Sequence, residues 1–360
     1  MRTGAQHGRT PRGFDLVDSL GRRLKFGSAR RVGLVCSPVF GIASAARFHM
    51  RKILSSLSLL MLAVAQASAE NAGSAAGSVE LLVLGSGGPG AEGRASSSYV
   101  LFVEGTPRIL VDAGPGSFAR MGEAHLDLER LDVVLLTHLH VDHAAELPGI
   151  VKARAVATSH PIHFDVFGPG GHPAHGEVPF FPSTRRFMEI LFGSHGAFAY
   201  LKDFAAPVSF TVTDLPLTAR AVEPEVIYED DNVTIRALRG HHDDAPAVIY
   251  RIDVGGRSMV FSGDIDAHGL PALESIARGA DLLVFDAVVL DPPGSPAILY
   301  SLHSPPRAIG ELAARDHIGH LLLSHLSPAV DENRLAVTAS IATHYAGLVA
   351  FASDGLRVRP

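Results

Sequence analysis

The sequence predicts an α/β fold for most of this 360-residue chain. Short apolar runs rich in Val, Ile, Leu and Phe alternate with helical stretches, which is the pattern of an α/β domain. Several of these apolar runs end in His, Asp and Ser residues. Because open sheets collect ligand-binding residues at the C-terminal ends of their strands, the pattern that predicts the fold also predicts a site.

The predicted elements are one capped helix and six strands. Ser183 is a helix-capping residue in front of an amphipathic helix at 184–192, within a segment at 168–206 that is rich in Gly, Pro and aromatic residues. We expect this segment to form a helical insertion over the substrate, with Phe187, Phe192, Phe198 and Tyr200 as pocket walls, although core packing would explain the same aromatics. The predicted strands are 108–111, 131–136, 233–238, 258–261, 282–285 and 320–323.

The densest cluster of ligand-type residues follows the run 131–136. His138, His140, Asp142 and His143 lie within six residues, and imidazole with carboxylate suits zinc and similar divalent ions. In an extended segment, residues two apart face the same side, so His138 and His140 can bind one ion. Asp142 and His143 lie where the chain can turn toward a second ion. The alternative is a solvated His-rich loop.

Three later strands supply further ligands. Candidates follow each strand directly: His241 and His242 after 233–238, Asp264 after 258–261, and His325 after 320–323. This set, with the 138–143 motif, resembles the metallo-β-lactamase superfamily from about residue 81 to residue 350. It is most similar to the branch that contains ribonuclease Z and arylsulfatase-like enzymes. The resemblance implies a four-layer αββα sandwich in a single domain at 70–360.

The resemblance also implies a site with two divalent metal ions. His138, His140 and His242 would bind the first ion, Asp142, His143 and His325 the second, and Asp264 would bridge both. We choose His242 because its spacing to Pro246 and Tyr250 fits the family, while His241 stays open. Zinc is the expected metal, with manganese or iron as alternatives. A metal ion lowers the pKa of a bound water to about 7, which makes a hydroxide nucleophile available for ester hydrolysis.

Three further residues have expected roles. Asp142 would also orient the nucleophile. His303 resembles the His of a ribonuclease Z motif that helps protonate the leaving oxygen, and Asp286 stands where that family usually has Glu. An ordinary loop His would explain His303 equally simply. Asp112 precedes a Gly-rich turn and would either orient a metal-binding His or stabilise the turn.

The first 69 residues carry a separate signal. The basic pair after Met50, the apolar stretch 53–64 and the Ala-x-Ala pattern at 67–69 predict a signal peptide at 50–69 and a periplasmic or secreted enzyme. We interpret residues 1–49 as a non-native extension if translation starts at Met50, or otherwise as an Arg-rich targeting extension. The stretch is too short to span a membrane comfortably, so we expect no membrane anchor in the mature chain.

Charge bears on the substrate. Residues 1–69 hold 11 of the 31 Lys and Arg and 2 of the 37 Asp and Glu, which leaves 20 basic and 35 acidic residues and a formal net charge of −15 at 70–360. Polyanion binding normally needs a basic surface, so we expect a small phosphodiester or sulfate ester rather than nucleic acid. The alternatives are a ribonuclease Z-like tRNA 3′ endonuclease, a lactone or β-lactam hydrolase, and a non-catalytic metal-binding protein. A homodimer is a further expectation, since dimers are common in the similar branch.

Overall fold

The computed structural model describes residues 78–360 except 91–92, 175, 177–178, 217–222 and 244. The predicted signal peptide and the extension before it lie outside the described residues. Within the described part of the chain, no helix combines the length and apolar character needed to cross a bilayer.

Fourteen strands form two seven-stranded sheets among the described residues. The first sheet, in the order β14-β1-β2-β3-β4-β5-β6, consists of β1 (Val79–Gly85), β2 (Ser98–Val103), β3 (Thr106–Val111), β4 (Val133–Leu135), β5 (Ile162–Pro169), β6 (Val208–Leu215) and β14 (Arg357–Val358). The second, in the order β13-β12-β11-β10-β9-β8-β7, consists of β7 (Glu225–Glu229), β8 (Val233–Arg239), β9 (Val248–Val254), β10 (Arg257–Phe261), β11 (Leu282–Asp286), β12 (His320–Ser324) and β13 (Leu348–Phe351).

Both sheets are mixed, and each pairs antiparallel strands on one side with parallel strands on the other. In the first sheet, β1, β2 and β3 pair antiparallel, and β3 through β6 pair parallel. In the second, β7 through β10 pair antiparallel, and β10 through β13 pair parallel. Parallel strands need crossover segments, and these segments carry the helices.

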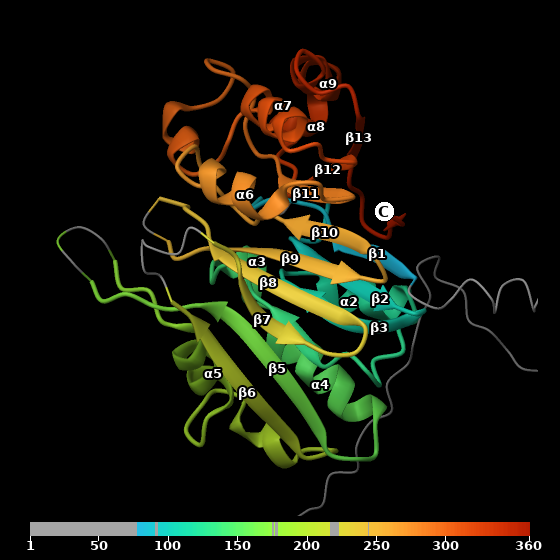
Figure 1. Ribbon diagram of the computed structural model, residues 1–360. Helices are drawn as coiled ribbons and strands as arrows, with labels where there is room; N and C mark the ends of the chain where they lie inside the picture. The colour runs from blue at the N-terminus through green and yellow to red at the C-terminus, as the bar shows by residue number, and fades with distance from the viewer. Residues whose placement is uncertain (1–77, 91–92, 175, 177–178, 217–222, 244) are drawn as a thin grey trace, which may run out of the picture. The chain divides into compact units, whose positions relative to one another are not determined.

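The helices cover the outer faces of the two sheets (Figure 1). The first sheet carries α2 (Ser117–Glu123), α4 (Leu147–Ala157), α5 (Thr184–Phe192) and the 3₁₀ helix η1 (Ala199–Asp203). The second carries α6 (Leu270–Ala277), α7 (Pro306–Arg315) and α9 (Arg334–Ala342). The short elements α3 (Val141–Ala144), η2 (Ala297–Ser301) and α8 (Pro328–Glu332) lie in loops.

Three apolar cores hold these layers together. Strand residues alternate between them: Leu81 and Val83 of β1 face the second sheet, while Leu82 and Leu84 face the helices. Because both faces are buried, the strands are almost continuously apolar, which is why they were recognisable in the sequence. The central core joins the two sheets and the outer cores join each sheet to its helices. The predicted four-layer αββα sandwich is therefore confirmed.

Candidate metal centre

The motif at 138–143 follows β4 of the first sheet and lies against β9 of the second sheet. β4 ends at Leu135, and the Thr137 carbonyl accepts a hydrogen bond of 2.8 Å from the Val248 amide of the second sheet. The Tyr250 hydroxyl donates to the Leu136 carbonyl at 2.9 Å. These two bonds fix the start of the motif against β9, so that the motif faces the loop between β8 and β9.

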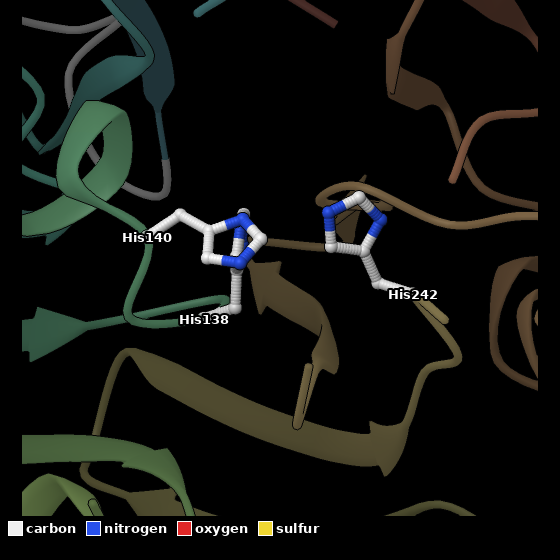
Figure 2. Close-up of side chains that lie close together, drawn as sticks. All are labelled: His138, His140 and His242. Carbon is white, nitrogen blue, oxygen red and sulfur yellow. The ribbon is translucent and has the colours of Figure 1, made fainter. Parts of the chain in front are cut away.

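The first group of ligands forms across this junction. The rings of His138 and His140 lie 5.1 and 5.2 Å from the ring of His242, and Figure 2 shows the three imidazoles gathered around a common space. His138 and His140 come from the segment between β4 and α3, whereas His242 follows β8. Their nitrogen atoms lie close enough together to share one ion.

The second group forms beside the first. Asp142 and His143 belong to the single turn of α3, and His325 follows β12. An Asp142 carboxylate oxygen lies 3.2 Å from His325 Nε2 and 3.8 Å from His143 Nε2. The two groups of three residues are those expected from the sequence.

Asp264 lies between the two groups. One of its oxygens is 3.6 Å from His242 Nε2 and 3.9 Å from His143 Nε2, and the other is 3.5 Å from His325 Nδ1. Asp264 follows Gly263, whose φ of 56° is in the left-handed region and whose Cα faces the Thr137 side chain. A Cβ at residue 263 would lie 2.8 Å from the Thr137 Cβ, so only glycine brings the Asp264 carboxylate this close to the motif.

The donor set fits two divalent cations. Among the described residues, five buried side-chain atoms of the cluster have no hydrogen-bond partner: His138 Nε2, His143 Nε2, Asp264 Oδ1, His303 Nδ1 and His325 Nδ1. Leaving so many buried polar atoms unsatisfied in one place is costly unless a ligand pairs with them. Donors about 2.0–2.2 Å from one zinc ion lie roughly 3–4 Å apart. The oxygens of Asp142 and Asp264 lie 3.2 to 3.9 Å from nitrogens of His143, His242 and His325, which matches this spacing.

The protonation of the cluster follows from burial and from its carboxylates. Burial lowers the pKa of His138 well below its usual range, and the neighbouring His143 lowers it further. Burial also opposes the charge on His143, but the carboxylates around it, Asp112 first, together raise the pKa of His143 to about 10. Burial opposes ionisation of Asp264 too, yet the surrounding histidines, His325 first, hold its pKa well below the usual range. The Asp264 carboxylate is thus ionised and available to cations.

Main-chain and carboxylate acceptors orient two of the histidines. The His143 Nδ1–H group donates to Asp112 at 2.8 Å. Asp112 therefore orients a candidate metal ligand, which is one of the two roles expected from the sequence. The His242 Nδ1–H group donates to the Leu302 carbonyl at 2.8 Å. In both residues this bond leaves Nε2 directed into the cluster.

The neighbouring His241 lies outside this cluster. Its Nδ1 pairs with the Asp266 carboxylate at 2.8 Å, and its ring packs 5.1 Å from the ring of His268. Its side chain is 38% exposed, compared with 2% for His242. Of the two candidates left open by the sequence, His242 is the one that the structure brings to the metal centre.

His303 and Asp286 both lie beside Asp264, but with different partners. His303 Nδ1 is 4.0 Å from Asp264 and its ring packs on His242, whereas Asp286 groups with Asp264 and His325. Burial lowers the pKa of His303 to about 4, so its imidazole is neutral at pH 7. Burial raises the pKa of Asp286 to about 8. In the described part of the chain, no hydrogen bond joins His303 to Asp286.

The aromatic residues of the 168–206 insertion divide into two sets. Phe192 is buried in the core and stacks on Phe210 at 5.0 Å. Phe187, Phe198 and Tyr200 line a pocket of about 500 Å³ together with Leu139 of the metal motif. Phe181, outside the predicted pocket walls, also reaches the site, since its ring lies 6.1 Å from that of His140.

The chain matches the family model of the β-lactamase superfamily domain over residues 107–345. The chain belongs to the metallo-β-lactamase superfamily. Ribonuclease Z of Mycobacterium sp. (strain KMS) is 30% identical over 261 residues, which cover 70% of this chain and 85% of that protein. Ribonuclease Z of Mycobacterium marinum (strain ATCC BAA-535 / M) is 27% identical over 296 residues, covering 78% and 98%.

Solved structures of metallo-β-lactamase proteins share the fold. The metallo-β-lactamase fold protein YhfI from Bacillus subtilis superposes with a TM-score of 0.57 at 20% identity, covering 79% of this chain and all of that one. Human tRNase Z, short form, gives a TM-score of 0.58 at 21% identity, covering 78% and 98%. Family membership and the ribonuclease Z relatives confirm that this protein is a metal-dependent hydrolase acting on ester bonds.

Two contributors to the site had no signal in the sequence. The Leu302 carbonyl orients His242, but any residue offers a main-chain carbonyl, so nothing in the residue type indicates the contact. Phe181 stands among many aromatics of the insertion, and only its packing on His140 distinguishes it. Asp112 was recognised from its place after a predicted strand, whereas Thr137, which also follows a predicted strand, had no predicted role.

Proposed function

We propose that this metallo-β-lactamase protein is an exported di-metal hydrolase of small phosphodiesters, with zinc as its metal. The observation that carries the proposal is the pair of three-residue ligand groups on either side of the Asp264 carboxylate. A nitrogen-rich and carboxylate donor set without thiolate suits zinc, with manganese or iron as alternatives.

The expected ligands keep the roles that the sequence implied. His138, His140 and His242 would hold one ion, Asp142, His143 and His325 the other, and Asp264 both. When bound, two divalent ions supply a hydroxide nucleophile at neutral pH and offset the charge that develops on the substrate. In this proposal the Asp142 carboxylate would accept a hydrogen bond from the nucleophile, and His303 would help to protonate the leaving oxygen.

The charge of the chain supports a small substrate. Residues 70–360 contain only two lysines, Lys152 and Lys202, and carry a formal net charge of −15. Binding to a polyanion releases counterions in proportion to the cationic contacts made, and the 20 basic residues of this region are outnumbered by 35 acidic ones. A sulfate ester has the same tetrahedral geometry as a phosphodiester and is the first alternative within this class.

A second candidate function is a ribonuclease Z-type endonuclease. The observation that favours it is the 30% identity to Mycobacterium ribonuclease Z over 85% of that protein. It predicts cleavage of tRNA precursors and binding that weakens steeply with salt. The proposed export of the chain and its acidity favour the small substrate.

Export is itself part of the proposal and depends on the pattern at 50–69. N-terminal sequencing of the protein from the periplasm or medium should find Glu70 as the first residue. A protein that stays in the cytoplasm with an intact N-terminus would contradict it.

The test of function combines metal content with a substrate panel. The panel holds a bis-aryl phosphodiester, an aryl sulfate, a lactone, a cephalosporin and a tRNA precursor. We expect about two metals per chain and chelator-sensitive turnover of the phosphodiester. Asp142→Ala should abolish turnover with the circular dichroism spectrum unchanged. Exclusive cleavage of the tRNA precursor would support the second candidate, and no metal after reconstitution with zinc or manganese would overturn both.

A further inference from the structure

A second pocket, of about 460 Å³, borders the metal centre on the side of His303. Its walls come from Gly87 after β1, Val288 after β11, Leu299 and Leu302 in and after η2, and Leu326 after β12. This volume is in the range of pockets that bind small organic molecules.

The pocket is joined to the metal centre through three of its wall residues. His303 faces both, because its ring lines the pocket while its Nδ1 lies 4.0 Å from Asp264. Leu302 lines the pocket and holds His242 through its carbonyl. Leu326 directly follows His325. The pocket and the cluster are therefore adjacent and share His303 as a common wall.

The walls are largely apolar, and one carboxylate at the rim, that of Glu332, is not part of an ion pair among the described residues. Val288, Leu299, Leu302 and Leu326 supply apolar surface. Arg94 also lines the pocket, but its guanidinium is 2.6 Å from Asp331 and donates to the Ser86 hydroxyl. Glu332 is exposed at the rim, and no ion pair occupies it among the described residues. The pocket thus offers apolar contact and a carboxylate, with its one guanidinium already bonded.

We propose that this pocket receives the leaving alcohol of the substrate and selects an apolar alcohol that is neutral or cationic. The proposal rests on the proposed phosphodiester hydrolysis. In that reaction the oxygen of water bonds to phosphorus, and the bond from phosphorus to the leaving oxygen breaks. The leaving oxygen keeps the electron pair and takes up a proton. The alcohol occupies the pocket with its oxygen at His303, and the Glu332 carboxylate at the rim disfavours a second phosphate.

The first test compares methyl aryl phosphodiesters whose phenols have nearly equal acidity. We expect a 4-butylphenyl leaving group to raise kcat/KM about tenfold or more over phenyl, because the butyl chain adds apolar contact in the pocket. We expect 4-(2-aminoethyl)phenyl to react faster than 4-(2-carboxyethyl)phenyl. Equal values of kcat/KM across the series, with clear turnover of all members, would overturn the proposed role of the pocket but would not contradict the proposed hydrolase activity. No turnover of any member would contradict the proposed function instead.

The second test uses two neighbouring residues of η2. Leu299 is half-buried and lines the pocket, whereas Ile298 is 69% exposed and does not line it. Leu299→Arg should remove the preference for 4-butylphenyl, and Ile298→Arg should keep it. If Leu299→Arg fails to fold, Leu299→Ala should still reduce the preference severalfold. Glu332→Gln should narrow the difference between the aminoethyl and carboxyethyl substrates, while Glu229→Gln, on β7, should leave it unchanged.

The third test does not depend on turnover. Binding of free 4-butylphenol to the protein, measured by calorimetric titration, should be at least tenfold tighter than binding of phenol and should weaken in Leu299→Arg. Chemical shift changes should map to Leu299, Leu302 and Leu326. Equal binding of 4-butylphenol to the folded Leu299→Arg protein and the unsubstituted protein would overturn the proposal.

Discussion

An Asp112 carboxylate oxygen lies 2.8 Å from Nδ1 of His143, although the two residues are separated by 31 positions in the sequence. The same carboxylate accepts hydrogen bonds of 2.8 Å from the amide and the hydroxyl of Thr137. One buried side chain at the end of β3 thus positions both the start of the metal motif and one of its histidines.

Substitution of Asp112 should weaken metal binding while preserving the fold. Asp112 has a φ of 56°, and Asn tolerates this left-handed conformation, so Asp112→Asn isolates the loss of the charged acceptor. We expect metal affinity or activity to fall about 10–100-fold. Metal titration with a competing chelator would measure this. Asp165→Asn, in β5 of the same sheet, is the control. Unchanged metal affinity in Asp112→Asn would show that His143 needs no such support.

The two adjacent histidines should behave differently. His242 Nε2 lies 3.6 Å from Asp264, whereas His241 pairs with Asp266. His242→Ala should lower the metal content from about two ions to about one per chain, because it removes one of three ligands of the first ion. His241→Ala should keep both ions. Elemental analysis of the purified variants decides between them, and the reverse outcome would exchange their roles.

His303 should matter most for poor leaving groups. A residue that assists the leaving oxygen contributes more when the departing alcohol is less acidic. His303→Ala should therefore lose at least about tenfold in kcat with a phenyl leaving group, and less with 4-nitrophenyl. His320→Ala, at the opposite end of β12 from His325, should alter neither. An equal loss for both leaving groups would assign His303 a structural role alone.

Asp316 makes stability depend on pH. Its carboxylate is fully buried and has no hydrogen-bond partner among the described residues, and burial raises its pKa to about 6. The folded state therefore binds this proton more tightly than the unfolded state, whose Asp has a pKa of about 3.9. The stability that protonated Asp316 contributes to the folded state is fully present below about pH 4, and this contribution is lost as the pH rises through about 6.

Asp316→Asn should remove the free-energy cost of ionising this buried carboxyl group above pH 6. The Arg278 guanidinium lies 3.9 Å away and offsets part of the cost of the buried charge, so we expect about 1–2 kcal/mol of added stability at pH 7.5. The gain should be small near pH 4.5. Urea unfolding at both pH values measures it. Asp281→Asn is the control of opposite sign, because its partners Ser258 and Arg257 lower the pKa of Asp281. A pH-independent effect of Asp316→Asn would contradict the assignment.

The sequence by itself determined the class of the fold and most of the candidate ligand set. Strands buried on both faces are nearly continuous apolar runs, and His138, His140, Asp142 and His143 are concentrated in one short segment. Such signals are local, so they survive in a single sequence. Asp264 and His325 were recognisable because each follows a strand and matches the family pattern.

Only the tertiary structure decided between residues that the sequence could not rank. His241 and His242 are identical in type and adjacent, and their different roles come from the Asp266 carboxylate and the Leu302 carbonyl. The leaving-group pocket likewise combines Gly87, Val288, Leu299 and Leu326, which are ordinary residues until the sheets bring them together. Contacts between segments more than fifty residues apart depend on strand order and packing, and neither spacing nor residue type contains that information.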